Sequence, residues 1–181
     1  MRIQLITAAA VLVLSAAGAT AQTVNPSLVG TWKASPDQVK LTTDFDKSVW
    51  GPDASSVRTV DLVIRQSGEA TLNVTKKVVD ARGRAVAAST WIEEVQFTLG
   101  RPQDGVANRV EHDAKVASAV RRFPDDPDYK WNLDGLRVKV VTFKDGDGGS
   151  IEIRYDTPEG RGSFWETLRR DRAPASKRST S

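Results

Sequence analysis

Short runs with an apolar residue at every second position, separated by turn residues, make up most of the sequence after residue 27. The clearest run is 58–66, in which Val60, Leu62 and Ile64 recur with this period before a tight turn at 67–69. A period of two places these side chains on one face of a β-strand. The chain is therefore expected to fold as a series of antiparallel strands.

Six further runs have the same character, and the last of them covers residues 164–170. The apolar sets that share a face in the other five are Leu28, Gly30 and Trp32; Ala70, Leu72 and Val74; Trp91, Val95, Phe97 and Leu99; Leu136, Val138 and Val140; and Ile151, Ile153 and Tyr155.

Three segments carry mixed signals. Residues 109–123 fit a strand, although their alanines and charges also suit a helix; we favour the strand. Pro124 and Pro127 should prevent a regular ladder or helix over 124–128. The polar connection 36–56 has room for one helical turn at its start, with Ser35 as the cap.

With 109–123 included, eight runs follow one another through short connections. Such a meander has two free edges unless its last strand pairs with its first. Closure of eight strands leaves an interior that side chains fill or that holds one small ligand. The predicted fold class is all-β, an eight-stranded antiparallel up-and-down β-barrel with room for one short helix.

The two ends of the sequence differ from this pattern. Residues 1–21 combine a basic start, an apolar stretch and the small residues Ala19 and Ala21, which is typical of a secretory signal cleaved after Ala21. We expect a barrel domain over residues 22–172, a disordered basic tail over 173–181, and a periplasmic or secreted location. No membrane segment is expected after cleavage, because no second apolar stretch follows.

Composition excludes several kinds of chemistry. The chain has no Cys and one His, which removes thiol nucleophiles, disulfides, a lipid-modified cysteine and most metal sites. No phosphate-binding loop or nucleophile elbow occurs, so we expect no cofactor and no metal. The formal net charge is +3, and six basic residues against two acidic ones follow Gly160. This excess is concentrated in the tail, so nucleic-acid binding is not expected.

Three motifs resemble the lipocalins and the wider calycin group. Leu28-Val29-Gly30-Thr31-Trp32 is similar to their Gly-x-Trp signature, and Leu168-Arg169-Arg170 is similar to their closing aliphatic-x-Arg pattern. Residues 129–136 resemble a segment of bacterial lipocalin-like domains. The resemblance implies that Gly30, Trp32 and Arg170 are structural pins of one barrel end. The chain has no counterpart of the family's Thr-Asp-Tyr type motif or of the helix that follows the last strand in typical lipocalins. The resemblance is therefore to a divergent exported bacterial member, and it does not imply a particular class of ligand.

The predicted inward faces supply candidate residues for a ligand cavity. They are Ile64, Leu72, Trp91, Glu93, Phe97 and His112. An inward Glu93 needs a partner such as Arg170 or a ligand, or a place at the wet mouth of the barrel; we favour the mouth. For His112 we favour a hydrogen-bonded residue of the barrel wall.

Other patterns have simpler explanations. The acidic segment 145–152 begins like a calcium loop, but it lies between two strands and is favoured as a hairpin turn. Asp125, Asp126 and Asp128 are favoured as a solvated loop.

We favour a monomeric binding protein, without enzymatic activity, for a small apolar or amphipathic molecule. The alternative is a protein-interaction or inhibitor module with a filled barrel, which presents Phe45 and Trp50 on the long loop. An isomerase or cyclase is the least favoured class, with Glu93 and His112 as its acid–base pair.

Overall fold

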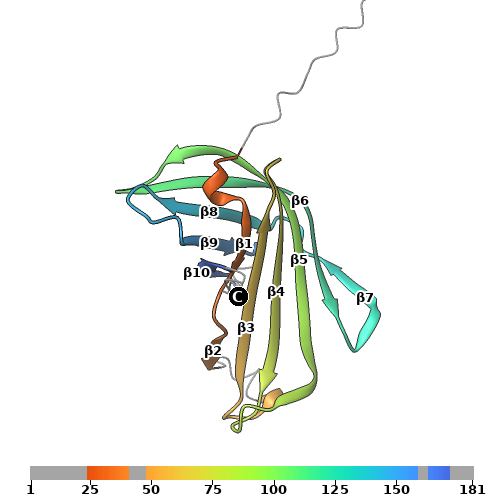
Figure 1. The fold of residues 1–181 in the computed structure, drawn as a ribbon. Helices are drawn as coiled ribbons and strands as arrows, with labels where there is room; N and C mark the ends of the chain where they lie inside the picture. Colours follow the sequence, from red (N-terminus) through yellow and green to blue (C-terminus); the bar gives the residue numbers. More distant parts are fainter. Residues whose placement is uncertain (1–23, 41–47, 159–162, 172–181) are drawn as a thin grey trace, which may run out of the picture.

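A computed structural model describes residues 24–40, 48–158 and 163–171 (Figure 1). The predicted signal segment 1–21, Phe45 and the tail 173–181 lie outside these residues. Within the described ranges, no helix has the length and apolar character needed to cross a membrane.

Among the described residues, 48–50 are helical, and the labelled elements are one short helix and ten strands. In chain order they are η1 (Pro26–Leu28), β1 (Gly30–Lys33), β2 (Asp37–Lys40), β3 (Ser55–Ile64), β4 (Glu69–Val79), β5 (Ala85–Asp104), β6 (Arg109–Phe123), β7 (Asp126–Asn132), β8 (Arg137–Phe143), β9 (Ser150–Asp156) and β10 (Phe164–Arg170).

Eight of these strands close into a barrel. The antiparallel order is β1-β3-β4-β5-β6-β8-β9-β10, and β10 returns to β1. Trp32 marks the closure, because it lies opposite Leu62 of β3 on one side and Arg170 of β10 on the other. The predicted eight-stranded up-and-down β-barrel is confirmed, and 109–123 is a strand. Figure 1 shows β3, β4 and β5 as a long wall and β8, β9 and β10 as shorter strands inclined to it.

Two strands correct the sequence analysis. The helical turn expected after Ser35 is wrong, because β2 pairs there with the first residues of β3 and continues the line of β1. One helical turn, η1, lies earlier, over Pro26–Leu28, and residues 48–50, later in the connection, are also helical. The expected break over 124–128 is also too long. β7 begins at Asp126 and pairs with β6, and Pro127 is tolerated because it lies in an edge strand.

The inward faces of the strands fill the barrel. The fully buried side chains include Trp32, Val60, Leu62, Ile64, Leu72, Val74, Ile151, Ile153, Tyr155 and Leu168. These residues form one apolar cluster across β1, β3, β4, β9 and β10. Their every-second-residue spacing is the predicted alternation. The candidate sites lie at one end of this core and inside the barrel.

Candidate functional site

The three predicted pins meet at one end of the barrel. Trp32 is fully buried, and its Nε1 donates a hydrogen bond to the carbonyl of Leu28 at 2.9 Å. The Arg170 guanidinium lies 4.3 Å from the indole centroid and donates to the carbonyls of Val29 at 2.7 Å and Ser27. Gly30 has a φ of 140°, and a Cβ there would lie 2.7 Å from Nη1 of Arg170. A larger residue at position 30 would displace the guanidinium.

A cavity of about 650 Å³ lies at this end, and Leu28 and Trp32 are among the residues that line it. It is bounded by η1, by the β5–β6 hairpin and by the β8–β9 hairpin. Its apolar lining includes Leu28, Trp32, Val110, Phe143 and Ile151. A cavity of this size lies in the range of small-molecule sites.

His112 is the buried titratable group of this cavity. It is 6% exposed, and its Nδ1 lies 3.4 Å from the carbonyl oxygen of Gly100. A carbonyl can only accept, so in this hydrogen bond Nδ1 carries the proton and Nε2 of the neutral ring is an acceptor. Burial lowers the pKa of His112 below its usual 6.5, and the bond to Gly100 only partly offsets this effect. The ring is therefore neutral at pH 7.

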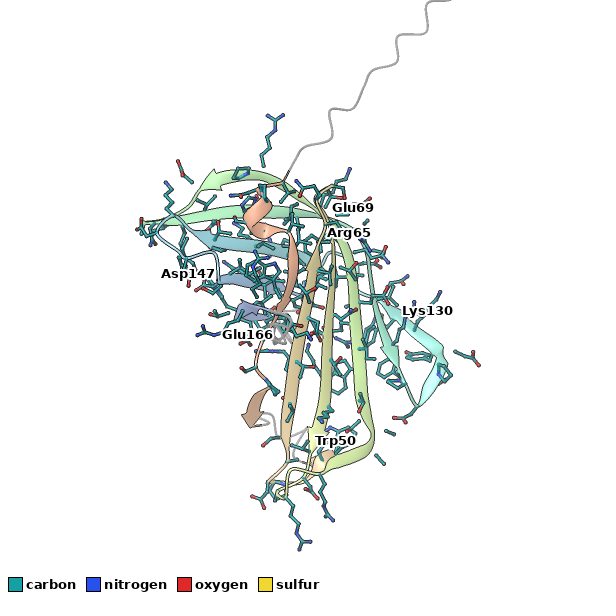
Figure 2. All side chains as sticks on the ribbon, in the orientation of Figure 1. Trp50, Arg65, Glu69, Lys130, Asp147 and Glu166 are labelled. Atoms are coloured by element: carbon teal, nitrogen blue, oxygen red, sulfur yellow. The ribbon has the colours of Figure 1, made fainter. Side chains whose placement is uncertain are left out.

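The rim of the cavity is acidic as well as basic. Lys144 lines the cavity but is paired with Asp104 at 2.7 Å. Asp147, labelled in Figure 2, accepts a hydrogen bond from the backbone of Gly149 at 2.8 Å within the β8–β9 turn. Among the described residues no group of His, Asp and Glu could hold a metal ion, and 145–149 is a hairpin turn.

A second cluster of polar groups lies inside the barrel around Glu93. Lys76 Nζ approaches its two carboxylate oxygens at 3.3 and 3.2 Å, and Arg121 donates to Oε1 from Nε at 3.0 Å and from Nη2 at 2.7 Å. The Tyr155 hydroxyl donates to Oε2 at 2.7 Å. Glu93 is fully buried, so the interpretation of a mouth residue is wrong, and its partners do not include Arg170.

The electrostatics of this cluster keep Glu93 ionised. Burial by itself would raise the pKa of its carboxyl, but Lys76, Tyr155 and Arg121 together hold that pKa below its usual value. Burial raises the pKa of the Tyr155 phenol, and the neighbouring carboxylate adds to the effect, so the hydroxyl remains a donor. Burial lowers the pKa of Lys76 more than Glu93 restores it.

Aromatic rings and a second ion pair surround this cluster. Phe164 stacks on Tyr155 with ring centroids 4.8 Å apart, and the Arg58 guanidinium lies 4.1 Å from the centroid of Phe164. Arg58 of β3 also pairs with Glu166 of β10 at 2.8 Å. The sequence analysis did not identify Lys76 and Arg58 as site residues. The every-second-residue alternation could have shown that both side chains point inward, because Lys76 follows Val74 in β4 and Arg58 precedes Val60 in β3 by two positions.

The predicted cavity residues occupy different parts of the molecule. Ile64, Leu72 and Phe97 are buried in the core, and the end cavity is lined by none of them. Glu93 belongs to the interior cluster, and His112 lines the end cavity. Trp91 is half-buried on the same strand face as Glu93.

Glu93 and His112 do not form an acid–base pair. Glu93 lies opposite Arg121 of β6, nine positions along that strand from His112. At about 3.3 Å per residue this separation is roughly 30 Å, far beyond proton-transfer distance. Trp50, expected as an exposed anchor, is half-buried.

Comparisons with known proteins find remote structural similarity. No protein-family model matches the chain, and no curated protein matches it. Similar solved structures include a de novo designed fluorescence-activating β-barrel, 12% identical, covering 80% of this chain and 94% of that chain with a TM-score of 0.34. Another is EF1p2_mFAP2b bound to DFHBI, 12% identical over the same shares with a TM-score of 0.32. The architecture of this chain therefore rests on its own strand pairing.

Proposed function

We propose that this protein is an exported member of the lipocalin-like (calycin) barrels that binds a small neutral amphipathic molecule in the cavity beside Trp32. One observation carries the proposal: a cavity of about 650 Å³ combines apolar walls with the neutral ring of His112. Most of a small ligand can be buried there, while one polar group fixes its orientation.

The pin geometry supports membership of the calycin group. Gly30, Trp32 and Arg170 occupy the motif positions of the resemblance, and they contact one another where the first and last strands meet. Export rests on the signal pattern of residues 1–21 with cleavage after Ala21, which implies a periplasmic or secreted protein.

The polar groups of the cavity favour a ligand with a hydroxyl donor. Nε2 of neutral His112 accepts a hydrogen bond but does not donate one. The carboxylate of Asp147 lies in the lining, and the one lining lysine, Lys144, is paired with Asp104. A carboxylate ligand would meet an acceptor and a like charge, so an alcohol or phenol with an apolar body fits better.

The filled interior directs the ligand to the end of the barrel. A molecule placed between Leu72 and Phe97 would have to displace side chains that are at most 2% exposed. The end cavity needs no such displacement. His112 is therefore the member of the predicted ligand-binding set that we assign to ligand contact.

Calorimetric titration with decanol and with decanoic acid at pH 7.5 tests the proposal. Decanol is expected to bind and decanoate to bind at least about tenfold more weakly, a difference of about 1.4 kcal/mol. Val110→Trp fills the cavity and should abolish decanol binding, whereas Val63→Trp, on the outer face of β3, should not. Binding that is absent, or equal in both variants, would contradict the proposal.

A further inference from the structure

A small cleft lies between the β6–β7 hairpin and the residues that follow β9. It has a volume of about 40 Å³ and is lined by Arg121, by residues 131–134, and by Thr157 and Pro158. Figure 1 shows this hairpin projecting from the barrel wall. The cleft is separate from the cavity beside Trp32, since the two share no lining residue. Its size admits the polar head of a small ligand, whereas an apolar body must lie outside it.

Arg121 has one edge of its guanidinium free. Its Nε and Nη2 both donate to Oε1 of Glu93, at 3.0 and 2.7 Å. Nη1 makes no hydrogen bond to a described residue, and it is not a buried atom. The edge formed by Nη1 and Nη2 can therefore donate two parallel hydrogen bonds to the two oxygens of a carboxylate.

Asp134 brings the opposite charge to the same cleft. It is exposed, and it has no ion-pair partner among the described residues. Leu136 donates its N–H to the carbonyl of Leu133 at 3.3 Å, which closes a tight turn around Asp134 and Gly135. A Cβ on Gly135, whose φ is 77°, would lie 3.0 Å from Pro158. The turn that carries Asp134 thus packs closely on a residue of the opposite wall.

The two charges line one cleft without pairing with each other. Arg121 forms its ion pair with Glu93 and not with Asp134. Two cations, Lys76 and Arg121, and two carboxylates, Glu93 and Asp134, make the cluster and the cleft neutral together. An anionic ligand would meet the carboxylate of Asp134, and a cationic ligand would meet Arg121. A ligand with two separated charges and no net charge is complementary to both groups.

Trp131 adds an apolar surface beside these charges. It lies opposite Arg121 in the β6–β7 ladder, and the guanidinium carbon is 5.5 Å from the centroid of its ring. The residue is 50% exposed, so its indole can still receive another ring. A ligand whose carboxylate is bound to Arg121 can therefore place an aromatic side chain against Trp131.

We propose that this cleft binds a free α-amino acid with an aromatic side chain. The carboxylate binds the free edge of Arg121, the ammonium group binds Asp134, and the ring stacks on Trp131. An α-amino acid carries both charged groups on one carbon atom, whereas either terminus of a peptide carries only one of them. The bonds between Arg121 and Glu93 stay intact, and the proposal is independent of ligand binding beside Trp32.

Calorimetric titration with three related ligands at pH 7.5 tests the two charges separately. L-Phenylalanine has both charges, 3-phenylpropionate lacks the ammonium group, and 2-phenylethylamine lacks the carboxylate. L-Phenylalanine is expected to bind, and each of the other two should bind at least about tenfold more weakly. The amine tests the role of Arg121 without disturbing its ion pair with Glu93.

Two exposed substitutions test the protein side. Asp134→Asn should weaken binding of L-phenylalanine by at least about tenfold and should strengthen binding of 3-phenylpropionate, because it removes a like charge. Trp131→Ala should weaken binding of L-phenylalanine, whereas Trp165→Ala, which removes another exposed tryptophan, should not. The melting temperatures should stay near that of the parent, because all three replaced side chains are exposed.

Three results would overturn the proposal. The first is the absence of binding at up to about 10 mM L-phenylalanine, beyond the range of a specific site. The second is binding of 3-phenylpropionate or 2-phenylethylamine as tight as that of L-phenylalanine. The third is an affinity for L-phenylalanine that Asp134→Asn or Trp131→Ala leaves unchanged.

Discussion

Arg170 lies over Trp32 with its guanidinium carbon 4.3 Å from the indole centroid, and it donates to the carbonyls of Val29 and Ser27. These contacts join the first and last strands of the barrel. The ladder between β1 and β10 has only two registered positions, Trp32 opposite Arg170 and Lys33 opposite Arg169. The side-chain contacts of Arg170 therefore hold β1 and β10 together where the short backbone ladder provides few hydrogen bonds.

Arg170→Lys should destabilise the protein by about 2 kcal/mol. Lysine cannot stack on the indole and donate to two carbonyls in one fixed geometry, so the part-buried carbonyl of Val29 or the exposed carbonyl of Ser27 loses its donor. Urea unfolding measures the change. Arg169→Lys is the matched control, because Arg169 is exposed, and it should change the free energy of unfolding by less than about 0.5 kcal/mol. Equal effects of the two substitutions would show that Arg170 is not a pin.

The parts of the fold that were predictable depend on local pattern. Leu62 and Leu72 lie opposite each other because both belong to runs with a period of two joined by the turn at 67–69. The helical turn expected after Ser35 does not form, because residues 37–40 pair with the edge of β3 instead. The local sequence around Pro36 carries no information about that distant strand. Tertiary pairing overrode a local preference there.

The partners of Glu93 were not predictable for a different reason. Lys76, Arg121 and Tyr155 are 17, 28 and 62 residues away in sequence. The alternation along its strand predicted that Glu93 points inward and so needs a partner. Which inward side chains reach it depends on the relative register of the strands, which the sequence does not show. The end cavity depends likewise on how η1 lies against two hairpins.

Glu93→Gln should cost about 3 kcal/mol of stability. The substitution keeps the shape of the side chain but leaves Lys76 and Arg121 without a compensating charge inside the barrel. Glu94→Gln is the control, because Glu94 lies on the opposite face and is 3.9 Å from an exposed Arg122. Adding Lys76→Met to Glu93→Gln should restore part of the loss, since it removes an unpaired cation. Strictly additive losses in urea unfolding would contradict this coupling.

The same carboxyl predicts a dependence on acid. Its pKa in the folded protein lies below the usual 4.5, so the unfolded chain takes up the proton first as the pH falls. The stability that Glu93 provides is fully present above pH 4.5 and is lost as the pH falls through the lower folded pKa. The parent should therefore lose more stability than Glu93→Gln when unfolding curves at about pH 6 and pH 3 are compared. Parallel losses would show that other carboxyls dominate.

Two tryptophans should respond in contrasting ways to replacement by phenylalanine. Trp91 Nε1 is buried and has no hydrogen-bond partner among the described residues, whereas Trp32 Nε1 donates to Leu28. Trp91→Phe removes an unsatisfied donor, which offsets the lost ring area, so the change should stay within about 1 kcal/mol. Trp32→Phe should cost about 3 kcal/mol, because it loses a satisfied bond and the surface under Arg170. Thermal unfolding of both variants measures the two changes. Similar decreases in melting temperature for Trp91→Phe and Trp32→Phe would contradict the prediction.

His112 predicts a second pH window, near neutrality. Burial, only partly offset by the bond to Gly100, holds the pKa of His112 below its usual 6.5, so the unfolded chain binds a proton that the folded chain resists. The free energy of unfolding should therefore fall as the pH drops below 6.5, and this component should level off below the folded pKa. Protonation of Nε2 in the folded protein also removes this acceptor, so decanol affinity should fall at lower pH, as the pH drops through the folded pKa of His112. Urea unfolding and calorimetry from about pH 7.5 to pH 5 measure both effects, and His112→Gln should lack them. A slope that persists in His112→Gln, or that has the opposite sign in the parent, would place the titrating group elsewhere.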